Sequence, residues 1–256
     1  TRGAGRLSAT LRAASLTGWN DPFALSLSAG RHALSVSASY GRVIHPSGLT
    51  LALTLGVDRS ETVAQPRIET QARFGEIALS YPVIVEERRR LTASAALHAF
   101  SERSDLAGVR TLDQDGGYLS LALSGAWFGD RASLVASQAV RVVAYDDAVA
   151  GTQGTRAVTL PGDATFSYRA TEATTLSLRA GWQIARRAPA PSRLEFTAAS
   201  PFAVRGYPTG LQAGDARWFL RAQIEHAVTS PALSGGASLT PFVFLDVGEA
   251  YDFDGR

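Results

Sequence analysis

Apolar and polar residues alternate along most of the chain, which is the pattern of β-strands with one apolar and one hydrated face. The clearest stretch is residues 49–58, where leucine or valine occupies every odd position and smaller or polar residues occupy the even ones. The same alternation predicts strands at about residues 7–13, 23–30, 34–40, 49–58, 70–81, 91–103, 116–127, 131–144, 161–170, 174–186, 216–228 and 239–251.

Two features of these segments favour strands that cross a membrane. Most are about ten residues long or more, as tilted transmembrane strands require. The links between them alternate in length, apart from a short one at 31–33. Shorter links are expected at 17–22, 43–47, 82–90, 128–130 and 171–173, and longer ones at 59–69, 104–115, 145–160 and 187–215. Short turns at one end and long loops at the other are typical of bacterial outer-membrane barrels.

Aromatic residues gather near the ends of the predicted strands, as the interfacial girdles of a membrane barrel do. No stretch approaches the ~18 consecutive apolar residues of a transmembrane helix. The pattern therefore predicts an all-β protein, an antiparallel transmembrane β-barrel that forms a single domain over residues 1–256. A soluble β-sandwich, whose strands also alternate but turn their apolar face inward, is the alternative.

Composition narrows the chemistry. The chain contains no cysteine and no methionine, and all 25 of its basic residues are arginine. Without cysteine, disulfides and cysteine metal sites are excluded. The formal net charge is only +2, and the arginines are scattered rather than arranged in a stripe. We therefore expect no nucleic-acid partner.

Neither histidine spacing nor known motifs indicate an enzyme. The histidines, which lack the spacing of metal ligands, are His32, His45, His98 and His226. The Gly-x-Ser-x-Gly, phosphate-loop and dinucleotide-binding motifs do not occur. We expect a protein that is not an enzyme, with no catalytic residue, no metal and no cofactor.

One motif stands out in the Pro- and Gly-rich link at about 187–215. It consists of Val204, Arg205, Gly206 and Tyr207. A buried arginine needs a partner, because an unpaired charge away from water is costly. Gly206 suits a tight loop tip, since glycine takes positive φ freely. Tyr207 brings a ring that can pack against Phe242 or Phe244.

A carboxylate suited to Arg205 lies in the later strand segment Phe244-Leu245-Asp246-Val247-Gly248. Alternation puts Phe244, Asp246 and Gly248 on one face of this strand and the aliphatic residues on the other. Asp246 is therefore expected to point into the interior of a barrel. We expect Arg205 and Asp246 to form an ion pair that latches the loop to the barrel wall, an arrangement suited to a gated pore.

The motif Val204-Arg205-Gly206-Tyr207, followed by Gly214-Asp215 and by the Phe-x-Asp-x-Gly strand at 244–248, resembles the signature of the BamA-type POTRA-barrel superfamily. Within it, the chain is most similar to two-partner secretion transporters of the haemolysin activator (ShlB/FhaC) type. The segments Thr1-Arg2-Gly3 and Asn20-Asp21-Pro22, and Gln183 before the loop, are similar to that branch too.

The resemblance implies a sixteen-stranded barrel in the bacterial outer membrane, preceded by periplasmic POTRA domains. Its loop folds back into the lumen, and the arginine of the loop pairs with the aspartate of the strand. These residues correspond to Arg205 and Asp246, and the supporting residues are Phe244, Gly248, Gly214 and Asp215. By this comparison the chain covers about twelve strands and is incomplete at both ends. It lacks most of the first strand, the last three strands and the POTRA domains.

The implied function is export of one large partner exoprotein across the outer membrane. The expected partners are this cargo, the lipid bilayer with its lipopolysaccharide, and the protein's own POTRA domains. A BamA-type factor that assembles or inserts outer-membrane proteins is an alternative within the superfamily. A diffusion porin for small solutes is an alternative of a different class.

Overall fold

The computed structural model describes residues 6–62, 66–194, 196–197, 204–205, 213–228 and 239–252. Among these residues, no helix has the length and apolarity needed to cross a membrane. They form a short 3-10 helix, η1 (Ser192–Leu194), and the strands β1 (Arg6–Ala13), β2 (Phe23–Gly30), β3 (Ala33–Val43), β4 (Thr50–Glu61), β5 (Ile68–Val85), β6 (Arg89–Leu106), β7 (Val109–Phe128), β8 (Ala132–Asp147), β9 (Thr152–Thr159), β10 (Gly162–Arg169), β11 (Thr174–Gln183), β12 (Ala185–Arg186), β13 (Phe196–Thr197), β14 (Ala213–Gly214), β15 (Ala216–His226) and β16 (Phe242–Tyr251).

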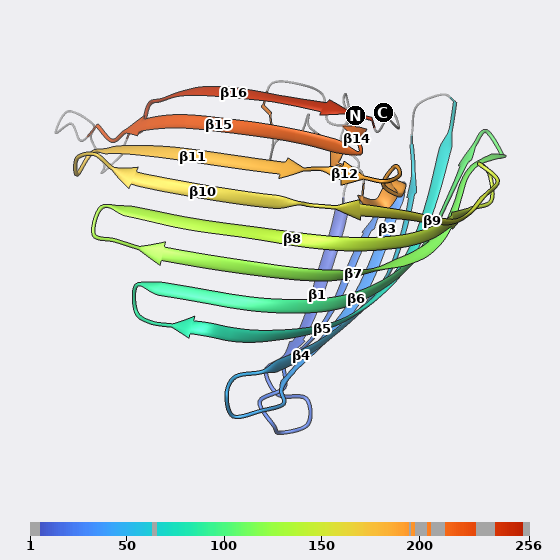
Figure 1. The fold of residues 1–256 in the computed structure, drawn as a ribbon, viewed down its shortest axis with the longest axis horizontal. Coiled ribbons are helices and arrows are strands. Elements are labelled where there is room, and N and C mark those ends of the chain that lie inside the picture. Colours follow the sequence, from blue (N-terminus) through green and yellow to red (C-terminus); the bar gives the residue numbers. More distant parts are fainter. Residues whose placement is uncertain are drawn as a thin grey trace. The chain divides into compact units, whose positions relative to one another are not determined.

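All but two of these strands belong to one antiparallel sheet of 14 strands (Figure 1). The neighbours in the sheet follow the order β1-β2-β3-β4-β5-β6-β7-β8-β10-β11-β15-β16. Off this path, β9 pairs with β8 and β12, and β13 pairs with β14 in a separate small sheet. Every predicted strand has a counterpart on the path, so the all-β, antiparallel class is confirmed. The described part of the sheet is not closed.

The chain divides into two compact units. The first consists of Thr1–Pro82, Ala93–Leu121 and Arg141–Ala157, and the second of Val83–Thr92, Ala122–Val140 and Val158–Arg256. The strands β5, β6, β7, β8 and β9 contribute residues to both. All the residues expected to form the latch belong to the second unit.

One of the predicted long links is wrong, and another contains a strand. The link at 104–115 is a two-residue turn at Ala107 and Gly108, which join β6 directly to β7. Both residues have positive φ, 50° and 84°, as the tight turns of β-hairpins require. The link at 145–160 contains β9, which pairs with β8 and with β12. The segment predicted as one strand at 174–186 is divided at Ile184 into β11 and β12.

The apolar rows of the strands are exposed in each unit. In the first unit, Leu55 lies opposite Ala38 in the pairing of β4 with β3, and it is 66% exposed. In the second, Val243 and Leu245 of β16 are 77% and 67% exposed, whereas the side chain of Asp246 is only 3% exposed. A soluble sandwich would bury its apolar face. The exposed rows instead favour a surface that faces lipid.

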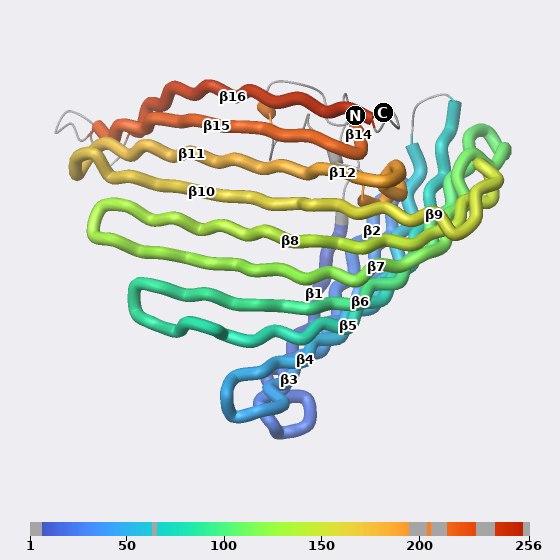
Figure 2. The backbone as a smooth tube through the Cα atoms, viewed as in Figure 1, coloured from blue at the N-terminus to red at the C-terminus, as the bar shows by residue number. Residues whose placement is uncertain are grey.

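The site lies on four neighbouring strands of the second unit, β10, β11, β15 and β16. Figure 2 shows these strands side by side in this order, with a tight turn between β10 and β11. Their register sets Thr165 opposite Arg179, Arg179 opposite Arg221, and Arg221 opposite Asp246. Because side chains alternate along each strand, these four residues share one face of the sheet. We call it the polar face.

Candidate functional site

Arg205 and Asp246 are joined by three hydrogen bonds. The backbone N–H of Arg205 donates to Oδ2 of Asp246 at 3.0 Å. Its Nε donates to the same oxygen at 2.7 Å, and its Nη2 donates to Oδ1 at 2.8 Å. The guanidinium thus engages both carboxylate oxygens in the parallel geometry that lysine cannot reproduce. The contact joins the segment before β14 to the middle of β16.

Two further side chains hold the guanidinium of Arg205. Its remaining nitrogen, Nη1, donates to Oε1 of Gln223 on β15. Its central carbon lies 4.0 Å from the centroid of the Phe244 ring, which is a cation–π contact. Gln223 in turn donates to Glu225 two residues further along β15. Arg205 is therefore held from two strands, β15 and β16, and its side chain is 21% exposed.

Val204 packs into a slot on the same face, beside the ion pair. It forms a buried apolar cluster with Phe219 of β15. A Cβ added to Gly248 would lie only 2.9 Å from the Val204 Cγ2 atom, and also 2.9 Å from the Trp218 carbonyl oxygen. The glycine therefore leaves the space that Val204 fills. Apolar packing and the ion pair act on consecutive residues of the same segment.

A second group of buried contacts joins both ends of the link at 187–215 to the sheet. Gln183, the last residue of β11, donates from Nε2 to the carbonyl oxygens of Leu194 and Asp215, at 2.7 and 3.1 Å. The carboxylate of Asp215 accepts the backbone N–H of Ala190 at 2.6 Å. Gly214 passes so close to β16 that an added Cβ would lie 2.7 Å from the Tyr251 carbonyl oxygen. These contacts give Gln183, Gly214 and Asp215 a structural role.

The structure brings together most of the residues expected at the site. Val204, Arg205, Phe244, Asp246 and Gly248 meet at one place, while Gly214 and Asp215 lie at the adjoining group of contacts. Gly206 and Tyr207 lie outside the described residues, and so does any packing of the Tyr207 ring.

Sequence reasoning missed Gln223 and Phe219 as partners of the loop. Alternation in β15 places both residues on the same face as Arg221, so the sequence pattern could have identified them as candidates. The sequence did not reveal which of the polar-face residues lies opposite Asp246, because that depends on the register of β15 against β16.

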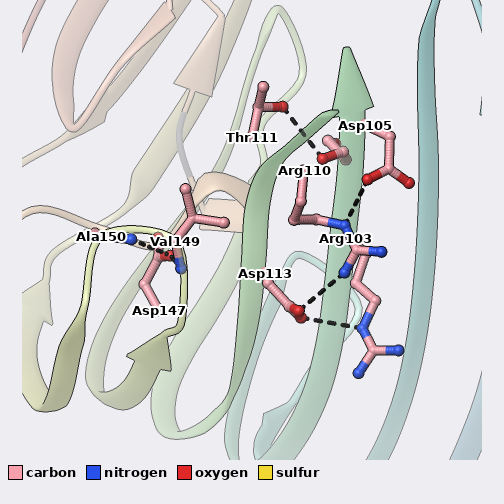
Figure 3. A network of polar contacts seen from close by, with 9 residues as sticks. Arg103, Asp105, Arg110, Thr111, Asp113, Asp147, Val149 and Ala150 are labelled. Carbon is pink, nitrogen blue, oxygen red and sulfur yellow. Dashed lines mark hydrogen bonds and ion pairs between the residues drawn. The ribbon is translucent and has the colours of Figure 1, made fainter. Parts of the chain in front are cut away.

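The first unit contains polar clusters of its own. At the turn between β6 and β7, Arg110 bonds Asp105 and Asp113, and Arg103 also bonds Asp113, at 2.5 to 3.0 Å (Figure 3). These side chains come from both strands of the hairpin and hold its end together. In no part of the described residues do three or more His, Asp or Glu side chains gather in a way that could hold a metal ion.

The turn between β1 and β2 is organised by one carboxylate. Asp21 is fully buried and accepts hydrogen bonds from Ser15, Thr17, Trp19 and Tyr40, at 2.8 to 3.2 Å. Burial raises the pKa of Asp21, but the hydrogen bonds from Thr17, Tyr40 and Ser15 favour the ionised form and hold the pKa well below its usual value.

No family model matches the chain, and no curated protein matches it in sequence. Solved structures do match. CdiB from Escherichia coli superposes with a TM-score of 0.75 at 13% identity, covering 98% of this chain and 50% of its own. CdiB from Acinetobacter baumannii gives 0.70 at 16% identity, covering 100% and 48%. BamA from Haemophilus ducreyi lacking POTRA domains 1–3 gives 0.75 at 11% identity, covering 98% and 56%.

The chain has the barrel fold of CdiB and BamA. This fold agrees with the resemblance drawn from the motif at Arg205 and from the strand of Asp246, although the sequence identity is low. The chain spans about half the length of each of these structures. Both kinds of barrel match almost the whole chain, so the fold alone does not separate them.

Proposed function

We propose that the chain is the barrel part of an outer-membrane pore that exports a large partner exoprotein, as in two-partner secretion. The observation that supports this most is the contact of Arg205 with Asp246, within a fold shared with CdiB, a two-partner secretion transporter. The contact holds a segment of the link at 187–215 against the polar face of the sheet. In a closed barrel that face lines the lumen, so the segment would obstruct the pore.

In the proposed mechanism, the segment opens when cargo binds POTRA domains of the same protein. The cargo crosses as an extended chain and folds outside, so that folding drives export. The expected surroundings are the outer-membrane bilayer with its lipopolysaccharide. The proposal assigns no catalytic step, metal or cofactor to the chain.

The test is Arg205→Ala in the full-length protein, with secretion of the partner exoprotein as the readout. We expect secretion to fall at least several-fold while the amount of folded barrel in the outer membrane stays the same. Arg186→Ala is the matched control, because Arg186 is an exposed arginine of β12 just before the same segment. Secretion by Arg205→Ala at the level of the control would overturn the proposed role of the contact.

A BamA-type factor that assembles outer-membrane proteins is the second candidate, and the match to the Haemophilus ducreyi BamA favours it as strongly as fold can. The two functions predict different losses when the protein is depleted. An assembly factor would lower the levels of many outer-membrane proteins. A secretion transporter would abolish the export of one exoprotein and leave the others unchanged.

A further inference from the structure

Three arginine side chains line one cavity on the polar face of the second unit. The cavity has a volume of about 240 Å³ and is lined by Thr165, Ser177, Arg179, Arg205, Arg221 and Gln223, with Leu178 between them. Of the described residues that line it, three carry a positive charge and none carries a negative charge. The neutral members present hydroxyl and amide groups, which can also donate hydrogen bonds.

The register places two of these arginines side by side. Arg179 of β11 lies directly opposite Arg221 of β15. Like charges at directly opposed positions of a sheet destabilise the strand pairing. A third arginine, Arg205, is brought against the same place by its contact with Asp246. Such a local conflict with a basic rule of sheet design is expected where a site serves a ligand rather than the fold.

The carboxylate of Asp246 is already bonded to Arg205. It accepts three hydrogen bonds from Arg205, at 2.7 to 3.0 Å. The Nε of Arg221 lies 3.8 Å from Oδ2 of Asp246, which is within ion-pair range but beyond a hydrogen bond. Arg179 packs against the Phe219 ring, 6.0 Å from its centroid.

Other charged side chains lie on the polar face of the surrounding strands. Arg217 adds another guanidinium to the polar face, 5.3 Å from the centroid of the Phe219 ring. Two carboxylates on this face of the neighbouring strands accept hydrogen bonds from neutral side chains. Asp163 accepts from Ser137, and Glu225 accepts from Gln223.

We infer that this cavity binds an oxyanion, and that the oxyanion is a carboxylate side chain of the cargo polypeptide that reaches the polar face while Arg205 is still in place. This rests on the proposed export function. A carboxylate fits because guanidinium groups bond both of its oxygens at once. The cavity has room for it together with several waters, since one water takes about 30 Å³ of liquid volume. A bound carboxylate would separate the like charges of Arg179 and Arg221.

The test is calorimetric titration of the full-length protein in detergent at low salt. The probes are inorganic phosphate, a short glutamate-rich peptide, and a glutamine-rich peptide of equal length. We expect the glutamate peptide to bind, phosphate to compete with it, and the glutamine peptide not to bind. Arg179→Gln should weaken the binding of both anions about tenfold or more. Arg169→Gln is the control, because Arg169 is on the same face of β10 but lines a separate depression beside Asp130.

Two results would overturn the site: no binding of either anion, or equal binding by wild type and Arg179→Gln. Binding of phosphate without the peptide would keep the oxyanion pocket but reject a polypeptide as its source. These results do not depend on secretion, so they can fail while the Arg205→Ala test of export succeeds, and the reverse.

A stability measurement excludes simple misfolding of the variant. Without an anion, Arg179→Gln removes one of two like charges, so its unfolding temperature should equal or exceed that of wild type. A residue kept for its packing on Phe219 would instead lower the unfolding temperature when replaced. Adding phosphate should raise the unfolding temperature of wild type more than that of the variant.

Discussion

At the scale of single residues, the site depends on the shape of the arginine group as well as on its charge. The Arg205 guanidinium reaches two oxygens of Asp246 and one of Gln223 while it lies over the Phe244 ring. Removing one partner of a buried ion pair lowers stability by about 3–5 kcal/mol, because the other charge is left buried without a counter-charge. Since Arg205 is partly exposed, we expect the lower end of that range.

Arg205→Lys separates charge from shape. Lysine keeps the positive charge but presents a single ammonium that cannot bond both carboxylate oxygens in parallel. We expect secretion by Arg205→Lys to lie between that of wild type and that of Arg205→Ala. Secretion is measured against the level of folded barrel in the outer membrane. Wild-type secretion by the lysine variant would mean that charge alone suffices.

Asp21 supplies a pH-dependent contribution to stability. Its folded pKa lies below that of an unfolded aspartate, about 3.9. Its contribution is therefore fully present above about pH 5 and is lost as the pH falls through and below 4. We expect the difference in unfolding temperature between wild type and Asp21→Asn to be largest at pH 7 and to shrink toward pH 3.

The control for this measurement is Asp130→Asn. Asp130 pairs with Arg88 at an exposed turn, where both side chains are in water, and such pairs contribute little. Its difference from wild type should stay near zero from pH 7 to pH 3. A constant difference for Asp21→Asn over the same range would contradict the assignment of the buried carboxylate.

At the scale of elements, the segment that contains Val204 is held by packing against two strands as well as by the ion pair. Gly248→Ala tests this packing alone. The added methyl would meet Val204, the Phe219 Cβ and the Trp218 carbonyl oxygen, all at 2.9 Å. The strand atoms cannot yield without disturbing the sheet, so Val204 must move. Overpacking of this kind costs about 1–3 kcal/mol.

We expect Gly248→Ala to lower secretion and to increase protease cleavage within residues 187–215 of the full-length protein. The control is Gly125→Ala on β7, where the added Cβ would make only ordinary contacts at 3.6 Å. Unchanged cleavage in Gly248→Ala would mean that the slot for Val204 does not hold the segment.

The strands and the partner of Arg205 were predictable to different degrees. Alternation indicated each strand on the main path, because one face of these strands is apolar and the other polar. It failed at residues 104–115, where charged side chains such as Arg110 and Asp113 occupy a strand of the hairpin and form an ion pair. Polar residues stand at consecutive positions there, so the period of two fades and the segment resembles a loop.

The site was predictable in its pair but not in its surroundings. Strand parity placed Asp246 on the polar face, and the motif supplied Arg205. The cavity between Arg179 and Arg221 depends on the register of β11 against β15. Neither the alternation along the strands nor the motif at Arg205 specifies that register. Two arginines that are far apart in the sequence give no signal until the pairing is known.

At the scale of the whole molecule, an obstructed export pore and an open porin differ in conductance. Replacing residues 187–215 with a short Gly-Ser linker in the full-length protein should raise its single-channel conductance in a planar bilayer. The reason is that the segment is held against the face that lines the lumen of a closed barrel. A steady conductance that is the same with and without the segment would support a diffusion porin.

The Arg205–Asp246 contact is tested most directly by a double-mutant cycle on secretion, with Arg205→Ala, Asp246→Ala and the two changes combined. Two residues that act only through their contact lose the same interaction in either single variant. We therefore expect the combined variant to secrete about as well as the worse single variant, with the barrel present at normal levels. Losses that multiply as for independent residues, or single variants that secrete normally, would contradict it.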